Sequence, residues 1–524
     1  MPKLIIDNMH LEVERGSTIL DAAGKVGIEI PTMCFLKGCE PSTSCMLCVV
    51  KLEGRARLLP ACGTIAEEGM HIETDSEEVR AARRMAMDLL LSEHLGDCMG
   101  PCQVTCPAQM NIPLMIRQIA AGRLNDAIAT VKKDIALPAV LGRICPAPCE
   151  KSCRRAVYDA AVSICLLKRY AADADLQSSR PHVPYCMPRQ GKRAAIVGAG
   201  PAGLAAAYYL MQQGYGCTVF DEHDKPGGML RYGVSREALG LDVLEAEIAT
   251  IEKLGPEFRP NTRVGRDVSM EELRKDFDAV FVAIGELEAG REQWLGLKMG
   301  ENGIKTDGNT YQTSEAGVFA GGDAVRRRRL TVRAVADGKE AAVAIGQYLS
   351  GAAVTGPVKL FNSRIGKLKD GEIERFLGGA SRQTRVTPSQ ENGGFARQEA
   401  VMEAARCLHC DCRKPQACKL RQYAQEFSAR AARYKDDRRT FEQSMQHPDV
   451  VFEPGKCIDC GLCVQITSRQ KVKLGLTFVG RGFDVRVAVP FNRSVAEGLR
   501  CTAKQCVEAC PTGALAFKED APGH

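Results

Sequence analysis

The stretch of sequence that decides the fold is residues 192–203, KRAAIVGAGPAG. An apolar strand at 194–197 precedes a small-residue helix expected at 204–210, and between them lie three glycines, Gly198, Gly200 and Gly203. A strand, a glycine-rich turn and a helix N-terminus together let backbone N–H groups approach a pyrophosphate. The stretch therefore predicts a Rossmann-like domain that binds a nucleotide.

The residues that follow indicate which nucleotide is bound. A second apolar strand at 217–220 ends at Asp221, whose carboxylate can accept the ribose hydroxyls of an adenine nucleotide. The segments KPGGMLRYG (225–233) and TSEAGVFAGGD (313–323) resemble the flavin-contacting segments of the glutamate synthase small-subunit family. This resemblance implies FAD, with the matching positions Gly227, Gly228, Met229, Arg231, Gly322 and Asp323 as further cofactor-binding residues.

A domain of that family is missing from the sequence. In the family, a second nucleotide-binding domain for NAD(P) follows the strand that ends in AIG, which is 283–285 here. Only about twenty residues separate Gly285 from Thr306, whereas a βαβ unit takes ~30. We therefore expect an FAD-binding domain over 186–352 that lacks the NAD(P) insertion and exchanges electrons with clusters or with a bound partner.

Composition narrows the class of protein. The chain has 524 residues, enough for several domains, and its 24 cysteines are clustered. Clustered CxxC-type spacings in a long chain indicate metal or cluster ligands rather than disulfides, and a reduced, cytoplasmic location. The net charge of +6 is too balanced to indicate nucleic acid. We expect no signal peptide, and no apolar run approaches the ~18 residues of a membrane span.

Residues 1–78 predict a small β-rich domain with one helix at 17–26 and a cysteine loop. Its cysteine spacing, C-x10-C-x2-C-x13-C, resembles the N-terminal β-grasp 2Fe-2S ferredoxin domain of the complex I large iron-sulphur subunit and of iron hydrogenases. The ligands expected are Cys34, Cys45, Cys48 and Cys62. Cys39 is left over, and a zinc ribbon is the alternative.

Residues 79–185 open with a helix over 76–95 that His94 closes. The rest resembles the helical double 4Fe-4S domain of glutamate synthase small subunits and dihydropyrimidine dehydrogenase. This resemblance assigns Cys98, Cys102 and Cys153 to one cluster, with His94 as its first ligand, and Cys106, Cys145 and Cys149 to the other. The family's last ligand falls near Lys168, a cation that cannot ligate, so either Cys165 replaces it or the cluster is incomplete.

Residues 353–450 are expected to form a linker that ends in a helix at 398–406 and a cysteine segment. Four cysteines in this segment could hold one 4Fe-4S cluster or a structural zinc: Cys407, Cys410, Cys412 and Cys418.

Residues 451–524 have the pattern of a bacterial ferredoxin, CxxCxxC followed by CVEACPTGAL. The fourth cysteine of each run in two-cluster ferredoxins ligates the other cluster, which gives one complete 4Fe-4S set: Cys457, Cys460, Cys463 and Cys510. Thr467 stands where the first run's fourth cysteine would be, so the second cluster is expected to be absent, with Cys506 as its remnant.

Taken together, the sequence predicts a multidomain α/β and α+β protein with FAD, one 2Fe-2S cluster and three to four 4Fe-4S clusters. It resembles electron-transfer subunits that accompany hydrogenases, formate dehydrogenases or aldehyde oxidoreductases, often beside an NADH-oxidising flavoprotein, and ferredoxin is a further candidate partner. That the FAD splits or merges electron pairs, as in bifurcating relatives, is a hypothesis. No motif indicates a substrate-transforming site. The alternatives are an NAD(P)H-dependent reductase like the glutamate synthase small subunit, and a zinc-binding scaffold.

Overall fold

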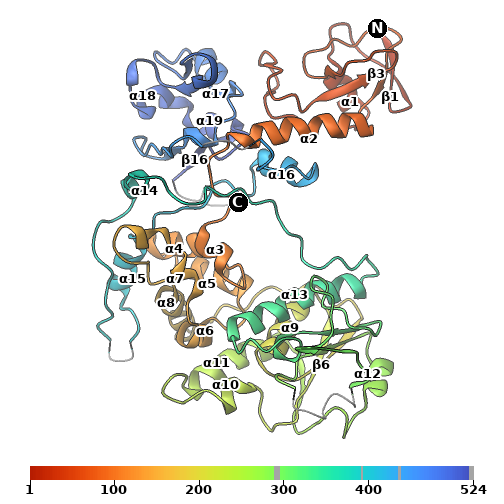
Figure 1. Cartoon of the computed structure of the whole chain (residues 1–524), viewed down its shortest axis with the longest axis vertical. Coiled ribbons are helices and arrows are strands. Elements are labelled where there is room, and N and C mark those ends of the chain that lie inside the picture. The colour runs from red at the N-terminus through yellow and green to blue at the C-terminus, as the bar shows by residue number, and fades with distance from the viewer. Residues whose placement is uncertain (288–294, 391–392, 435–437, 519–524) are drawn as a thin grey trace. The chain divides into compact units, whose positions relative to one another are not determined.

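The computed structural model of the chain describes residues 1–287, 295–390, 393–434 and 438–518 (Figure 1). These residues form two compact units, and each is described by itself. Unit 1 comprises residues 1–100, 360–379 and 409–518, and unit 2 comprises residues 101–359 and 380–408. Both units are therefore built from segments that are far apart in the sequence.

Unit 2 contains a five-stranded parallel sheet with the order β12-β9-β6-β7-β8. Its strands are β6 (Arg193–Val197), β7 (Gly216–Phe220), β8 (Glu257–Arg259), β9 (Ala279–Val282) and β12 (Val318–Ala320). The central strands are buried almost throughout, as expected for parallel strands covered on both faces. The predicted parallel α/β domain and its two strands at 194–197 and 217–220 are confirmed.

Helix α9 (Pro201–Gln212) follows β6 and packs against α13 (Thr331–Leu349), as Figure 1 shows. The two helices approach closely at Gly338, where an added Cβ would lie 2.2 Å from the carbonyl oxygen of Ala202. Pro201 at the first turn starts α9 three residues earlier than the sequence indicated. The remaining elements of this part are α10 (Met229–Tyr232), α11 (Leu241–Glu252), α12 (Met270–Asp276), the hairpin β10 (Met299–Gly300) and β11 (Gly303–Ile304), and the 3-10 helix η3 (Gly322–Ala324).

The cysteine-rich part of unit 2 is helical. It consists of α3 (Pro101–Thr105), α4 (Ile112–Ala120), α5 (Leu124–Asp134), α6 (Pro138–Ile144), α7 (Pro148–Lys151), η1 (Arg154–Val157), α8 (Ile164–Leu176) and α15 (Arg397–Ala404). These helices share one hydrophobic core with the nucleotide domain. The carboxylate of Glu247 on α11 accepts the backbone N–H groups of Ala139 and Val140 at 2.7 and 2.8 Å, which joins α11 to the start of α6.

Unit 1 begins with a five-stranded mixed sheet in the order β2-β1-β5-β3-β4. The elements are β1 (Lys3–Ile6), β2 (Met9–Glu12), α1 (Ile19–Lys25), β3 (Val49–Leu52), β4 (Leu59–Pro60) and β5 (His71–Glu73). Thr18 and Asp21 form a capping box that fixes the start of α1. The following helix, α2 (Glu77–Ser92), ends at Ser92, so His94 lies just beyond the helix instead of closing it.

The C-terminal part of unit 1 pairs β13 (Val450–Phe452) with β16 (Leu515–Phe517) around a core that includes the buried Cys506. Its helices are α17 (Leu462–Arg469), α18 (Val495–Leu499) and α19 (Ala503–Ala509), and a hairpin of β14 (Thr477–Val479) and β15 (Arg486–Ala488) is inserted between them. The Oγ1 of Thr467 accepts from the N–H of Leu476 and donates to the Cys463 carbonyl, so this residue has a structural role.

The segment expected to be a linker is packed into both units. Residues 360–379, with α14 (Glu372–Phe376), belong to unit 1, as does α16 (Lys419–Glu426). The buried carboxylate of Glu372 pairs with Arg438 and accepts the N–H of Phe441 at 2.7 Å. Several basic side chains of this segment are partners of buried carboxylates, so it is more than a connecting linker.

Within the described ranges, we find no helix with the length and apolar character required to cross a membrane.

Candidate functional site

Four thiols gather in the cysteine loop of unit 1. Cys34, Cys45, Cys48 and Cys62 are all buried, and the sulfur atoms of Cys34 and Cys45 lie 3.4 Å apart. The hydrogen bond that this pair shares lowers the pKa of Cys34 to about 5 and raises that of Cys45. Cys48 and Cys62 also share a hydrogen bond, which lowers the pKa of Cys48 to about 7 and raises that of Cys62. Four buried, neighbouring thiols, two of which have lowered pKa values, suit cationic iron, which binds the thiolate form.

Cys39, the fifth cysteine of this loop, stands apart from that set. Its sulfur accepts a hydrogen bond of 3.3 Å from the guanidinium of Arg469 and is half-buried. This placement agrees with its expected exclusion from the ligand set.

A second group of four thiols lines a small hollow in unit 2. Three of them, Cys106, Cys145 and Cys149, are the set expected from the sequence, and the fourth is Cys165 on α8. Cys145 and Cys165 share a hydrogen bond that lowers the pKa of Cys145 to about 6 and raises that of Cys165. The structure thus places Cys165 beside the other three thiols. From the sequence, Cys165 was one alternative and an incomplete cluster was the other.

Lys168 also lines this hollow, one turn after Cys165, and is buried. Burial opposes the charge of this ammonium, but the four thiols around it outweigh burial and raise its pKa. Within the described residues, Lys168 has no carboxylate partner. The hollow therefore combines four thiols with one buried positive charge.

Three further cysteines of unit 2 are partly buried and pack against its core: Cys102, Cys153 and Cys407. Burial raises the pKa of the Cys153 thiol, and Arg406 acts on it in the opposite direction. Cys407 directly follows α15 and is the one member of the predicted 407–418 set that belongs to unit 2.

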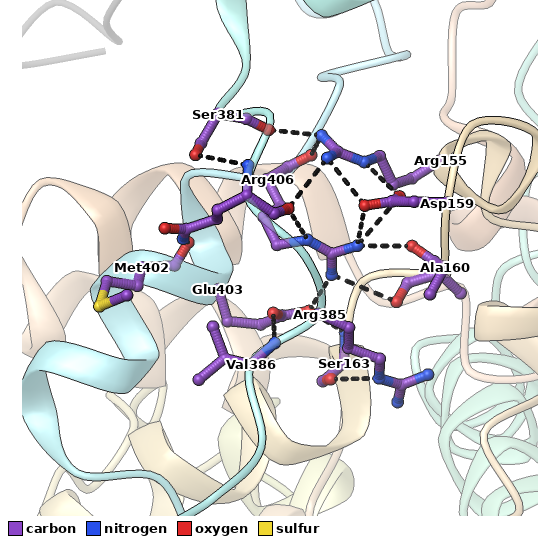
Figure 2. Close-up of polar contacts among 12 residues, drawn as sticks. Arg155, Asp159, Ala160, Ser163, Ser381, Arg385, Val386, Met402, Glu403 and Arg406 are labelled. Atoms are coloured by element: carbon purple, nitrogen blue, oxygen red, sulfur yellow. Dashed lines mark hydrogen bonds and ion pairs between the residues drawn. The ribbon is translucent and has the colours of Figure 1, made fainter.

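A buried network of charges holds α15 against the cysteine helices (Figure 2). Arg155 donates to the carbonyl groups of Ser381 and Arg406 and pairs with Asp159 at 2.7 Å. Arg406 pairs with Asp159 and, at 2.6 Å, with Glu403. Despite burial, these two guanidinium groups lower the pKa of Asp159. The network lies between the segment that carries Cys153 and the one that carries Cys407.

The same network continues toward Cys165. Glu403 accepts the N–H of Ser163 at 2.7 Å, and Arg385 donates to the Oγ of Ser163. Arg385 also pairs with Glu150, whose other oxygen accepts the N–H of Cys165 at 3.0 Å. Residues 380–408 thereby fix the start of α8, where Cys165 lies.

In unit 1, Cys98 lies with Cys412 and Cys418, whereas the sequence grouped it with Cys102 and Cys153, which belong to unit 2. The N–H of Cys412 donates to the carbonyl oxygen of Cys98 at 3.4 Å, and all three thiols are buried. Burial raises the pKa of Cys98, and Cys412 raises it further. The pKa of Cys418 is raised to about 12 by burial, then by Cys412 and Cys98. Cys410, also in unit 1, is half-buried.

His94 lies near this group. Its Nδ1 is shielded from solvent and has no hydrogen-bond partner within the described residues. Burial, and then the ammonium of Lys456, lower the pKa of His94 to about 3. The buried Lys456, which is paired with Glu453, also acts on Cys98 and Cys412, so it neighbours all three residues.

The ferredoxin-like part brings together the predicted set Cys457, Cys460, Cys463 and Cys510. Burial raises the pKa of the first three thiols, and the thiol of Cys510 contributes to each shift. The side chain of Lys414 donates to the carbonyl groups of Val507 and Cys510, both at 2.7 Å, and so fixes the end of α19. Cys501 is exposed and lies outside the set.

The glycine-rich turn of unit 2 has the close approaches that its glycines suggest. An added Cβ at Gly203 would lie 1.9 Å from the carbonyl oxygen of Gly198, and Gly198 itself has a φ of +104°. The second loop closes over the turn, because the N–H of Gly227 donates to the Ala199 carbonyl and a Cβ at Gly228 would meet the Cα of Gly200. A Cβ at Gly200 would meet nothing within 4 Å. This open position at the start of α9 fits a phosphate.

The polar residues expected at this site have protein partners. Asp221 accepts the N–H groups of Ala199 and His223 at 2.6 and 2.9 Å, and Asp323 accepts that of Arg328 at 3.0 Å. Arg231 is buried and pairs with Glu245, whereas Met229 is exposed. Gly322 has a φ of +68° beside Ala202. The glycines thus form the cradle, and Arg231 supports the loop.

The described residues contain no three His, Cys, Asp or Glu side chains arranged to hold a single metal ion. In a 4Fe-4S cluster each thiolate binds a different iron, and in a 2Fe-2S cluster the four thiolates bind two irons, so either set is more spread out than the four ligands of one zinc ion.

Three protein families match parts of the chain. Residues 3–77 match a 2Fe-2S iron-sulphur cluster binding domain, and residues 89–180 match the dihydropyrimidine dehydrogenase domain II, 4Fe-4S cluster. Residues 196–249 match an NAD(P)-binding Rossmann-like domain. The predicted 2Fe-2S, 4Fe-4S and Rossmann-like domains are thereby confirmed.

Among similar proteins, the NADP(+)-dependent formate dehydrogenase subunit beta of Moorella thermoacetica is 39% identical over 225 residues, covering 39% of this chain and 32% of that protein. The NADPH-Fe(3+) oxidoreductase subunit beta of Geobacter sulfurreducens is 39% identical over 207 residues, covering 39% and 30%. The glutamate synthase [NADPH] small chain of Bacillus subtilis is 39% identical over 182 residues, covering 34% and 36%. The chain thus spans about a third of the length of each of these relatives.

Proposed function

We propose that this chain is an electron-transfer subunit of a multisubunit oxidoreductase and that it carries FAD and iron-sulphur clusters. The observation that carries the proposal is the hollow lined by Cys106, Cys145, Cys149 and Cys165, in a helical domain that shares one core with the nucleotide domain. A rigid common core keeps a cluster and a flavin at a fixed separation, which electron transfer between them requires.

The proposed ligand sets follow the groups of thiols. Cys34, Cys45, Cys48 and Cys62 would hold the 2Fe-2S cluster. Two 4Fe-4S clusters would be held by Cys106, Cys145, Cys149 and Cys165, and by Cys457, Cys460, Cys463 and Cys510. Cys102, Cys153 and Cys407 supply ligands to a third. The glycine cradle from Gly198 to Gly203, closed by Gly227 and Gly228, would hold the FAD phosphates.

When bound, FAD handles electrons in pairs and iron-sulphur clusters carry them singly, so together they connect two-electron to one-electron carriers. The protein's own residues set the conditions for this exchange. Burial of the thiols excludes water, the network around Arg155 and Arg406 fixes the helices that carry them, and Lys168 places a positive charge in one cluster pocket.

Partners and location belong to the same proposal. The relatives above are named as subunits of formate dehydrogenase and of NADPH-Fe(3+) oxidoreductase. We infer that this chain assembles with a catalytic subunit of the hydrogenase, formate dehydrogenase or aldehyde oxidoreductase type and with an NADH-oxidising flavoprotein, with ferredoxin as a further electron carrier. Its 24 cysteines suit a reducing compartment, the cytoplasm.

A second candidate is an NAD(P)H-dependent reductase that resembles the glutamate synthase small subunit. The match of residues 196–249 to an NAD(P)-binding domain favours it. Against it, strands β9 and β12 of the one parallel sheet are joined, in the described residues, by the short hairpin β10–β11 and loops, without a second sheet of this kind.

Stopped-flow mixing of the anaerobically purified chain with NADPH or NADH separates the two candidates. The electron-transfer proposal expects the flavin absorbance to stay unchanged with either nucleotide alone and to bleach with dithionite, which shows that the flavin is present and reducible. Direct bleaching by NADPH supports the reductase instead. Purified protein that contains zinc and no iron overturns both.

A further inference from the structure

We propose that Cys98, Cys412 and Cys418, with His94 as the fourth ligand, form a separate 4Fe-4S site in unit 1. This site differs from both sets that the sequence suggested, because it takes Cys98 out of the helical double-cluster motif and divides the 407–418 cysteines. The inference rests on the proposed iron-sulphur function and adds one more carrier to it.

Three backbone contacts fix the position of Cys98. Its N–H donates to the carbonyl oxygen of Ser363 at 3.2 Å, its sulfur accepts the N–H of Ser363 at 3.4 Å, and its carbonyl accepts from Cys412. The neighbouring Asp97 accepts the N–H of Ile365 at 2.9 Å. Residues 360–379, which looked like a linker in the sequence, thus hold Cys98 against Cys412, and an N–H bond to sulfur is typical of cluster thiolates.

Cys412 and Cys418 are the other two thiols of the proposed site, and both lie near Cys98. A Cβ at Gly513 would lie 2.3 Å from the sulfur of Cys412, so Gly513 leaves the space that this thiol occupies. Cys418 is the N-cap residue of α16, and its backbone carbonyl accepts the N–H of Gln422. Three buried thiols from two separate segments therefore lie close together, at 8%, 6% and 5% exposure.

The fourth ligand follows by comparing the nearby candidates. Cys510 neighbours Cys418, but it also neighbours Cys457, Cys460 and Cys463, whose set it completes. His94 is four residues before Cys98, and its shielded Nδ1 is unpartnered within the described residues. An imidazole nitrogen without a hydrogen bond in a buried place is costly unless something binds it, and a neutral imidazole is a good metal ligand.

The charges around the site are consistent with a bound anionic cluster. Lys456 is buried next to His94, Cys98 and Cys412 and forms an ion pair with Glu453. Lys414 neighbours Cys412 and Cys418. A buried cluster with thiolate ligands carries net negative charge, which two neighbouring ammonium groups stabilise.

Double variants test the grouping, because ligands of one cluster are lost together. In anaerobically reconstituted protein, Cys98→Ala and Cys412→Ala are each expected to lose about four irons per chain, and the double variant is expected to lose no more. Cys98→Ala combined with Cys102→Ala should lose about eight irons, because these residues belong to different clusters. Cys501→Ala, at an exposed cysteine, is the control and should lose none.

The opposite pattern overturns the inference. If Cys98→Ala with Cys102→Ala loses only about four irons while Cys98→Ala with Cys412→Ala loses about eight, the grouping suggested by the sequence holds. If a Cys98 variant does not accumulate, pairs with Cys407 make the same distinction. Cys407→Ala with Cys412→Ala should lose about eight irons and Cys407→Ala with Cys102→Ala about four, whereas the grouping suggested by the sequence gives the reverse. Iron-free wild-type protein would instead reject the proposed function itself.

The role of His94 has its own spectroscopic test. Pulsed EPR of the reduced protein labelled with 15N-histidine should show a nitrogen coupling at one 4Fe-4S signal. His94→Cys should keep the iron content and abolish that coupling. Persistence of the coupling in His94→Cys, or its absence from the wild-type protein, would exclude His94 as a ligand.

Discussion

The guanidinium of Arg406 donates hydrogen bonds to both carboxylate oxygens of Asp159, each at 3.1 Å, although the two residues are 247 positions apart in the sequence. The nucleotide domain lies between them in the chain. This pair closes the network of Figure 2 and fixes the helix that leads to Cys407 against the segment that follows Cys153. Cluster ligands distant in the sequence can therefore be held by one rigid structure.

Replacing Arg406 should loosen that structure. Arg406→Met leaves the buried carboxylate of Glu403 without its ion pair, which costs about 3–5 kcal/mol for a buried pair, and leaves Asp159 with Arg155 alone. Hydrogen exchange of the α15 amides should become at least tenfold faster in this variant. The matched control is Arg385→Met at a partly exposed guanidinium, expected to cost below about 1 kcal/mol. Equal exchange in both variants would contradict a central role for Arg406.

Replacing Lys168 should lower the reduction potential of one cluster. The buried ammonium lines the same hollow as Cys106, Cys145, Cys149 and Cys165, and a nearby positive charge favours the reduced, more negative cluster. At a fixed potential, Lys168→Met should shift the ratio of reduced to oxidised cluster about tenfold, or about 59 mV for one electron. EPR-monitored redox titration measures this. The control is Lys151→Met, which removes an exposed positive charge two residues after Cys149. It should leave the midpoint potential of the cluster unchanged.

The 2Fe-2S site can be tested with two cysteines of one loop. Cys45→Ser replaces a buried thiol that lies 3.4 Å from Cys34, and it should remove about two irons per chain and the 2Fe-2S EPR signal. Cys39→Ser changes a half-buried thiol that contacts Arg469 and should leave both intact. Loss of the signal in Cys39→Ser alone would show that the ligand set is wrong.

Two glycine substitutions test the flavin cradle. Gly200→Ala places a methyl group in open space at the start of α9, where the FAD phosphates are proposed to lie, so the chain should fold but contain little FAD. Gly308→Ala is the control, because its Cβ also meets no atom within 4 Å and neither residue has a positive φ. The ratio of flavin absorbance to protein, with circular dichroism as the check on folding, decides the outcome. Full flavin content in Gly200→Ala would place the cofactor elsewhere.

Glu247 should make unit 2 less stable as pH rises. Burial raises the pKa of this carboxyl from 4.5 to about 7 in the folded chain. A raised folded pKa gives a contribution to stability that is complete below pH 4.5 and is lost as pH rises through 7, by about 3 kcal/mol in total. Between pH 5 and pH 8, the melting temperature of the wild-type protein should therefore fall relative to that of Glu247→Gln. A difference that is constant with pH would show that Glu247 does not titrate in this range.

Local patterns in the sequence were sufficient to predict the elements of the nucleotide domain, and they also suggested the ligand sets whose members are close in the chain. The strands at 194–197 and 217–220 and the glycine turn between them follow from apolar runs and glycine spacing, which act over a few residues. The groups Cys34–Cys62 and Cys457–Cys463 each lie within a short stretch of the chain. Cys510 joins the second group from farther along the chain, through the second cysteine run of the ferredoxin pattern.

The sequence by itself determined the kinds of domain, the glycine cradle and the cysteine-rich chemistry of this protein, because each is encoded by neighbouring residues. The tertiary structure alone decided that Cys165 completes the hollow in unit 2 and that Cys98 lies with Cys412 and Cys418. Spacing along the chain cannot encode such groupings, since they arise when buried carboxylates and guanidinium groups from distant segments must find partners and so draw those segments together.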